Sequence, residues 1–256
     1  VLYSTELLCA EHHFDLLIDG DQAKALVDRF DAYNFTEDIK IHLVPNLLET
    51  LWIQGPYAEE VYKKSSSYCA LSLEDRAWVD HQKIIWRRAS ITGEAGMVAH
   101  GDPEAIETLH DELLYLAKGQ VLPMGDQAAL VARLEAGLPL LGEELTSDEI
   151  LPETPWMDLA YQPGKGCFTG QEVVERLRMK GSPKVALVAL VGPSDMPAPV
   201  LASAVRVQGK NEGSFRASVP SVQLGGRLNY ALLKRRHRQP GARFDVEIEG
   251  QLWPVT

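Results

Sequence analysis

The stretch GKGCFTGQEVVERLRMKG, residues 164–181, joins a glycine-rich segment to a helical pattern. Thr169 and Glu172 have the T-x-x-E spacing of a capping box, so we expect a helix that starts at Gly170. Gly181 closes the pattern and is free to adopt a left-handed C-cap, which predicts the end of the helix there. The stretch therefore predicts a glycine-flanked turn that leads into one short helix.

A single cysteine, Cys167, lies just before the N-terminus of this predicted helix. The positive end of the helix dipole and the nearby Lys165 both favour a thiolate over a thiol. Gly164, Gly166 and Gly170 would allow the backbone to approach a ligand closely. The other interpretation is that Cys167 is a small buried apolar residue in a tight turn. The sequence alone leaves both open.

A carboxylate occupies an unusual place in RLEAGLPLLGEEL, residues 133–145. Gly137 and Pro139 predict that a helix ends here, and Glu135 lies just inside that end, where the helix dipole opposes its charge. A carboxylate in this position can accept hydrogen bonds from a guanidine-like edge of a ligand. The alternative is a solvated surface glutamate.

Two further stretches carry weaker signals. TPWMDLAYQPG, residues 154–164, supplies Trp156 and Tyr161, which can stack on a flat heterocycle or fill a core. ITGEAGMVAH, residues 91–100, reads as a hairpin turn with a glutamate between glycines. None of these segments resembles a phosphate-cradling loop, a nucleophile elbow or a dinucleotide fingerprint.

Composition limits the functional classes. The 256 residues carry a formal net charge of -11, which disfavours broad binding to nucleic acid. The basic run at 234–238 can contact a phosphate or can be a solvated strand end. No apolar run approaches the roughly 18 residues that a membrane span needs, so a membrane protein is not expected.

The three cysteines, Cys9, Cys69 and Cys167, are too widely spaced to form a metal motif. This pattern predicts no intrinsic metal site and fits a reducing compartment, which we take to be the cytoplasm. The first residue is Val1 rather than a methionine, so we expect the natural chain to begin earlier. The first stretch does not read as a signal peptide.

Strand and helix patterns alternate at short range through the first two thirds of the chain, which predicts an α+β fold. The predicted strands are 1–9, 13–18, 40–44, 48–55, 69–73, 82–88 and 96–100, and the predicted helices include one capped by Asp21 and one over 103–116. After the break at 181–183 the chain becomes a series of short strand-like runs separated by glycine and proline. We expect a small all-β unit there, a barrel or a sandwich.

Taken in order, TGEAG, RLEAGLPLLGEE and KGCFTGQEVVERLRMKG resemble the folate-binding superfamily of the glycine-cleavage T-protein. The form KGCxxGQE is similar to its YgfZ-type branch, which is associated with iron-sulfur cluster assembly or repair and, through iron-sulfur enzymes, with thiomethylation of tRNA. The resemblance runs from Val1 to the C-terminal β unit.

The resemblance implies two intertwined ferredoxin-like units followed by a small C-terminal β-barrel. The folate-binding α+β unit would comprise residues 1–45 with 130–182, the second α+β unit residues 46–129, and the barrel residues 183–256. Tetrahydrofolate or a derivative would lie in a central opening. The implied site residues are Cys167 as the functional thiol, and Glu135, Trp156, Lys165, Gly170, Gln171, Glu172 and Arg176 as folate contacts.

The leading hypothesis is therefore a folate-binding accessory protein that supports iron-sulfur cluster assembly or repair and, indirectly, tRNA modification. Its partners would be a reduced folate and iron-sulfur proteins or assembly factors. The alternative is a folate-dependent aminomethyltransferase. Tyr3 and Ser4 disfavour it, because T-proteins carry an acidic residue on the matching strand. A third class is an interaction scaffold that has lost its ligand.

Overall fold

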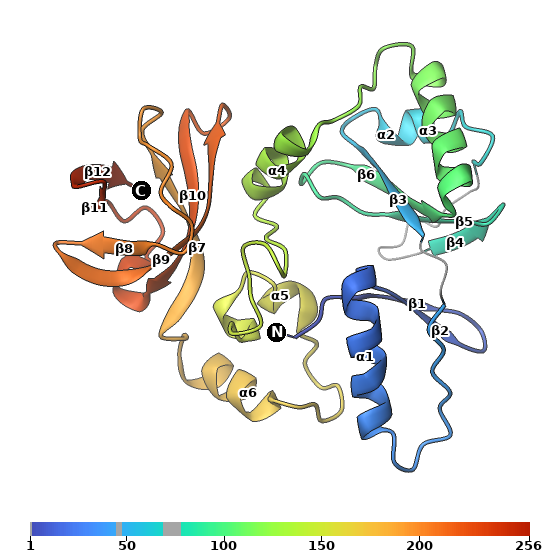
Figure 1. The fold of residues 1–256 in the computed structure, drawn as a ribbon, viewed down its shortest axis with the longest axis horizontal. Coiled ribbons are helices and arrows are strands. Elements are labelled where there is room, and N and C mark those ends of the chain that lie inside the picture. The colour runs from blue at the N-terminus through green and yellow to red at the C-terminus, as the bar shows by residue number, and fades with distance from the viewer. Residues whose placement is uncertain (1, 45–47, 69–77) are drawn as a thin grey trace. The chain divides into compact units, whose positions relative to one another are not determined.

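The computed structural model describes residues 2–44, 48–68 and 78–256. They divide into two compact units, one of residues 3–126 and one of residues 127–256 with Leu2. The mixture of helices and strands confirms the expected combination of both classes (Figure 1). The three-part division at 45, 129 and 182 stays a prediction, as does the ferredoxin-like description.

Residues 3–126 contain two antiparallel sheets (Figure 1). The two-stranded sheet pairs β1 (Glu6–Cys9) with β2 (Phe14–Leu17) and is followed by helix α1 (Gly20–Tyr33). The N-cap of α1 is Asp19 and not Asp21, so the predicted helix begins slightly earlier than the sequence suggested.

The four-stranded sheet of this unit has the order β3-β6-β5-β4. Its elements are β3 (Glu49–Gln54), β4 (Trp78–His81), β5 (Ile84–Arg88), β6 (Gly96–Gly101), and the helices α2 (Ala58–Tyr62) and α3 (Pro103–Ala117). Trp86, Met97 and Leu109 are among the fully buried side chains of its core. Helix α3 begins as predicted, with Pro103 in its first turn, and the side chain of Asp102 accepts a hydrogen bond from the Ala105 amide at 3.1 Å.

Residues 127–256 begin with short helices and end in a sheet. The helices are α4 (Asp126–Glu135), η1 (Leu151–Glu153), α5 (Met157–Ala160) and α6 (Gln171–Lys180), and η2 (Arg235–His237) follows later. The strands are β7 (Val185–Gly192), β8 (Ala204–Val207), β9 (Lys210–Ser221), β10 (Gly226–Lys234), β11 (Phe244–Ile248) and β12 (Gln251–Val255).

Alternation along β10 supplies two separate cores. Leu228, Tyr230 and Leu232 belong to the cluster that includes Leu134 of α4, whereas Ala231 and Leu233 belong to a second cluster with residues of β8 and β11. Successive side chains of a strand point to opposite faces, so one strand with apolar residues on both faces lies inside the unit.

The prediction of a closed C-terminal barrel is wrong. The six strands form one sheet of order β12-β11-β8-β9-β10-β7, with β12 and β7 as its two ends. Val191 and Thr256 exchange a pair of backbone hydrogen bonds of 3.0 and 3.1 Å, which joins the end strands at one place. One such pair is not a ladder, because pairing along the strands is what closes a barrel.

One other strand prediction is wrong, and one is not tested. Residues 40–44 form no strand, and Leu43 and Val44 are exposed there, so the apolar run has no partner strand to pair with. The strand predicted at 69–73 lies outside the described residues. The strand-like runs predicted after Lys184 are confirmed as β7 to β12.

Candidate functional site

Glu135 is the last residue of helix α4, as the sequence predicts. The helix is closed by two backbone hydrogen bonds, from the Gly137 amide to the Leu134 carbonyl at 3.0 Å and from the Leu138 amide to the Arg133 carbonyl at 3.1 Å. Gly137 has a φ of 77°, so this is a Schellman stop that requires the left-handed region. The stop fixes the direction in which the chain leaves Glu135.

A buried ion pair holds the segment after the stop. Arg133 donates to both carboxylate oxygens of Glu144, at 2.7 and 3.0 Å, and also to the Leu138 carbonyl at 2.8 Å. The Glu144 carboxylate additionally accepts from the Leu140 amide at 2.9 Å. A buried charge pair is stable only when further hydrogen bonds satisfy both partners. Here Arg133 and Glu144 each have such a bond to a backbone group.

The carboxylate of Glu135 itself is oriented by the turn between β9 and β10. Its Oε1 accepts a hydrogen bond from the hydroxyl of Ser221, which is buried, and the Ser221 oxygen accepts from the Leu224 amide at 3.0 Å. Glu135 is half-buried. One carboxylate oxygen is therefore held in place, and the other has no hydrogen-bond partner among the described residues.

Tyr230 supports the same helix end from β10. Its hydroxyl donates to the Leu134 carbonyl at 2.8 Å. Burial of the ring, followed by the charge of Glu144, raises the pKa of Tyr230 to about 12. The phenol therefore stays a donor at any ordinary pH, and the helix end keeps its support.

Cys167 lies in the segment 162–170, which we call the thiol loop. Its side chain is exposed, so the interpretation of a buried apolar residue is wrong. Gly164 and Gly170 have φ values of 78° and 87°, which explains glycine at both ends of the loop. Helix α6 follows with Gly170 as its N-cap and with no side-chain cap bond, so the predicted capping box does not form.

One contact ties the residue before the thiol loop to α6, and another lies within the loop. The Tyr161 hydroxyl donates to Glu175, whose other oxygen accepts from the Arg178 guanidinium at 3.2 Å. The hydrogen bond from Tyr161 lowers the pKa of Glu175 and raises that of Tyr161. The Lys165 ammonium lies 4.6 Å from the centre of the Phe168 ring. The loop is therefore closed at its base while its cysteine stays accessible.

The α6 residues that the resemblance assigns to folate differ in their contacts within the chain. Gln171 bonds to Phe168 twice, through its amide at 3.1 Å and its side chain at 3.4 Å. Glu172 and Arg176 are exposed and form no ion pair with any described residue; Arg178 and Glu175 pair instead. The C-cap glycine has a φ of 152°, outside the left-handed helical geometry that we predicted for it.

Trp156 packs against the hydrophobic cluster that contains Leu134 and Tyr230. Its ring is only half-buried. The packing confirms a core role for part of this side chain, and the stacking role stays a prediction.

The basic run at 234–238 is largely occupied by partners within the chain. Arg236 donates to Glu212, and Arg235 donates to the Ser182 carbonyl. Arg238 donates to the Pro183 carbonyl at 2.6 Å. The run therefore fastens the segment that follows α6, a role that the sequence did not suggest.

Two hollows are large enough for a small ligand. One of about 370 Å³ is lined by residues of α3 and its surroundings, and one of about 340 Å³ by residues between β7 and β12. Neither is lined by Glu135 or Cys167. The assignments of Cys167, Glu135, Trp156, Lys165, Gly170, Gln171, Glu172 and Arg176 to a folate site thus stay predictions.

Within the described parts of the chain, no group of three or more His, Cys, Asp or Glu residues is placed to hold a metal ion. Across the same residues, every helix is too short or too polar to cross a membrane.

Several known proteins that are similar in sequence to this chain are aminomethyltransferases. No family model matches it. An aminomethyltransferase of Lysinibacillus sphaericus is 26% identical over 255 residues, covering 96% of this chain and 68% of the relative. An aminomethyltransferase of Geobacillus kaustophilus is 30% identical over 223 residues, covering 84% and 60%. One of Corynebacterium aurimucosum is 35% identical over 173 residues, covering 65% and 45%.

A solved structure has the same fold. The glycine cleavage system aminomethyltransferase T from Bartonella henselae superposes with a TM-score of 0.83 at 21% identity, covering all of this chain and 70% of that protein. The chain thus spans 45 to 68% of the length of the three relatives and 70% of the structural neighbour. The names favour the transferase that Tyr3 and Ser4 disfavoured, and they lend no support to the iron-sulfur and tRNA roles.

Proposed function

We propose that this chain, whose relatives and fold support the T-protein superfamily, binds a reduced folate and acts in one-carbon transfer of the aminomethyltransferase class. The observation that carries the proposal is the half-buried Glu135, held by Ser221 at the end of α4 with one oxygen left to accept. A pterin presents an N–H edge of the guanidine type, which a carboxylate with a fixed orientation binds well.

The chemistry supplied by tetrahydrofolate would be the acceptance of a one-carbon unit. In this proposal Glu135 orients the pterin, and Trp156 offers part of an aromatic face beside it. Arg133 and Glu144 act indirectly, since their ion pair fixes the chain on both sides of the helix stop. A displaced carboxylate would lose affinity because hydrogen bonds weaken steeply with distance and angle.

The first experiment is a calorimetric titration of the chain with tetrahydrofolate. Glu135→Gln should weaken binding by at least about tenfold, because a charge-assisted hydrogen bond contributes roughly 1.5–3 kcal/mol. Glu143→Gln is the matched control, since it removes the same charge from an exposed position nearby. Equal affinity of the wild type and the Glu135 variant would remove Glu135 from the site. A parallel assay would follow formation of methylenetetrahydrofolate from an aminomethylated lipoyl protein.

A second candidate function is favoured by the accessible Cys167 on the tethered thiol loop. In this function the chain is a folate-binding accessory protein for iron-sulfur enzymes, with the thiol as its working group. One cysteine cannot hold a cluster alone, because such clusters normally take four ligands, so a partner protein would supply the others.

Cys167→Ser tests the second candidate in cells that lack the native protein. We expect the variant to restore less activity of iron-sulfur enzymes than the wild type does, because serine keeps the size of the side chain and loses the sulfur. Cys9→Ser is the control, since Cys9 is also an exposed free cysteine. Full restoration by the Cys167 variant would leave the transferase as the sole proposal.

A further inference from the structure

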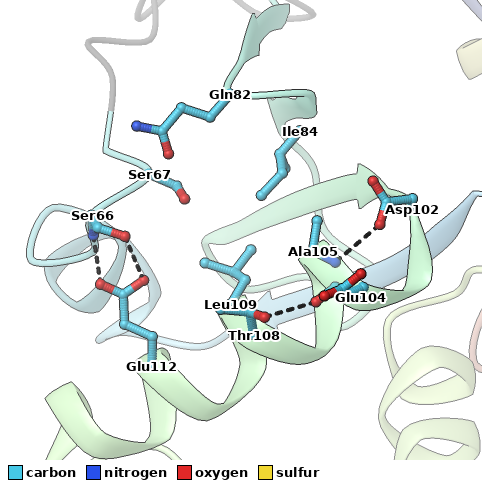
Figure 2. Close-up of a pocket in the computed structure, with 10 residues that line it drawn as sticks. All are labelled: Ser66, Ser67, Gln82, Ile84, Asp102, Glu104, Ala105, Thr108, Leu109 and Glu112. Carbon is cyan, nitrogen blue, oxygen red and sulfur yellow. Dashed lines mark hydrogen bonds between the residues drawn. The ribbon is translucent and has the colours of Figure 1, made fainter.

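A hollow of about 370 Å³ opens on helix α3 in the unit of residues 3–126. Figure 2 shows that its walls come from three segments: the loop after α2, the turn between β4 and β5, and the first part of α3. Small-molecule sites in proteins have volumes of roughly 300–1,000 Å³, so the hollow is large enough for a compact ligand.

The lining has acidic ends and an apolar middle. Asp102 and Glu104 lie at one end and Glu112 at the other, with Ile84 and Leu109 between them (Figure 2). The two glutamates are eight positions apart on the α-helix, which is about 12 Å along the axis. No basic side chain is among the described residues that line the hollow. This lining favours a ligand that is cationic at both ends.

The three carboxylates differ in how many further hydrogen bonds they can accept. Both oxygens of Glu112 accept from Ser66, at 2.7 Å from its amide and 2.9 Å from its hydroxyl. One oxygen of Asp102 accepts from the Ala105 amide. The Glu104 carboxylate forms no hydrogen bond or ion pair with a residue that the structure describes. Glu104 and the second oxygen of Asp102 can thus receive a donor.

Ser67 provides an independent sign of a ligand. The residue is 5% exposed, and its hydroxyl points into the hollow (Figure 2). In the described part of the chain this hydroxyl has no hydrogen-bond partner. A donor on a bound molecule would therefore give this hydroxyl the hydrogen-bond partner that it lacks within the described chain.

The spacing of the acidic groups decides between kinds of cation. Among the described residues they do not form a cluster that could hold a metal ion, which fits an elongated cation rather than a compact one. The N-terminus of α3 opposes a cation with about half a positive charge. The two full negative charges of Asp102 and Glu104 outweigh it.

We propose that this hollow binds a linear aliphatic diamine. One ammonium lies between Asp102 and Glu104, the methylene chain covers Ile84 and Leu109, and the second ammonium faces Glu112. The Ser67 hydroxyl accepts a hydrogen bond from the bound molecule. This site is separate from the folate proposal and does not depend on it.

The test is isothermal titration calorimetry of the full chain with 1,5-diaminopentane, and with 1-aminopentane as the singly charged comparison. We expect saturable binding of the diamine and binding of the monoamine that is at least about fivefold weaker. Glu104→Gln should weaken diamine binding about fivefold. Because Glu104 makes no bond to a described residue, this variant is expected to fold.

The matched control is Glu107→Gln, which removes the same charge from an exposed position on the same helix outside the hollow. Its affinity should stay equal to that of the wild type. Ser67→Ala should weaken binding about threefold through loss of one hydrogen bond. An equal loss in the Glu107 variant would show simple attraction to a chain of net charge -11 and overturn the site. Absence of saturable binding, or equal affinity for both amines, would do the same.

Discussion

Arg133 carries a full charge into the interior of its unit, and its environment explains how. It is 7% exposed and Glu144 is 2% exposed, with each partner satisfied by the other and by backbone groups. Removing one member of such a pair leaves an uncompensated buried charge, which is the larger part of the cost.

We therefore predict that Arg133→Met lowers the free energy of unfolding by about 3–5 kcal/mol. The double variant Arg133→Met with Glu144→Leu should recover most of that loss, because no lone charge remains buried. Urea unfolding of both variants and the wild type measures the difference. A single variant as stable as the wild type would show that the charges are solvated in solution.

At the residue scale the sequence predicted where a residue lies in its helix better than it predicted which residues contact it. The helix end at Glu135 was recognisable from glycine and proline signals that act locally. Ser221 was missed, because it lies 86 residues from Glu135 and is brought there by the β9–β10 turn. The ion pair of Arg133 could have been predicted from its place on the apolar stripe of α4, because a buried guanidinium requires a carboxylate partner.

At the scale of elements, helix α2 is fastened to strand β5 by a forked contact. Arg88 donates to both oxygens of Glu59, at 3.1 and 3.2 Å, and Lys63 adds an ion pair at 2.9 Å. The hydrogen bonds from Arg88, and then from Lys63, lower the pKa of Glu59 to about 2.

The pH dependence of this contact follows from the direction of that shift. A carboxyl whose pKa is lower in the folded state stabilises the fold above its unfolded pKa, and that stabilisation is lost as the pH falls towards the folded pKa. The window for Glu59 thus runs from its ordinary value of 4.5 down to about 2. Because the pair is partly exposed, its contribution is only about 0.5–1 kcal/mol.

Arg88→Met should therefore lower the free energy of unfolding by about 0.5–1 kcal/mol at pH 7, and the difference should shrink at pH 3. Urea unfolding at the two pH values checks this. Arg88→Lys, which keeps the charge and loses the forked geometry, should fall between the wild type and the Met variant. A Met variant with the same deficit at both pH values would contradict the assignment.

Element prediction succeeded where local and tertiary preferences agree. Helix α3 has a proline in its first turn, an aspartate cap and an apolar stripe, and the sequence located its ends to within one residue. The run at 40–44 has the composition of a strand and no partner, so strand propensity alone did not decide its structure. The T-x-x-E pattern failed because Gly170, in a left-handed conformation, serves as the N-cap instead.

At the scale of the whole chain, the sequence correctly predicted a mixture of helices and strands and the change to strands after Lys184. It did not reach the form of the last sheet, because closure depends on pairing between strands at opposite ends of the sheet, and no local pattern encodes that pairing. The candidate folate residues were drawn from a resemblance. Their joint placement stays a prediction, since neither of the two hollows is lined by Glu135 or Cys167.

The paired bonds between Val191 and Thr256 bear on self-association. An end strand normally presents a row of unpaired donors and acceptors on which another molecule can build. Here each end strand uses part of that row on the other, and Pro254 removes one more donor from β12. The pairing therefore covers one point of the β7 edge, at Val191, against addition of a strand from a second copy of the chain.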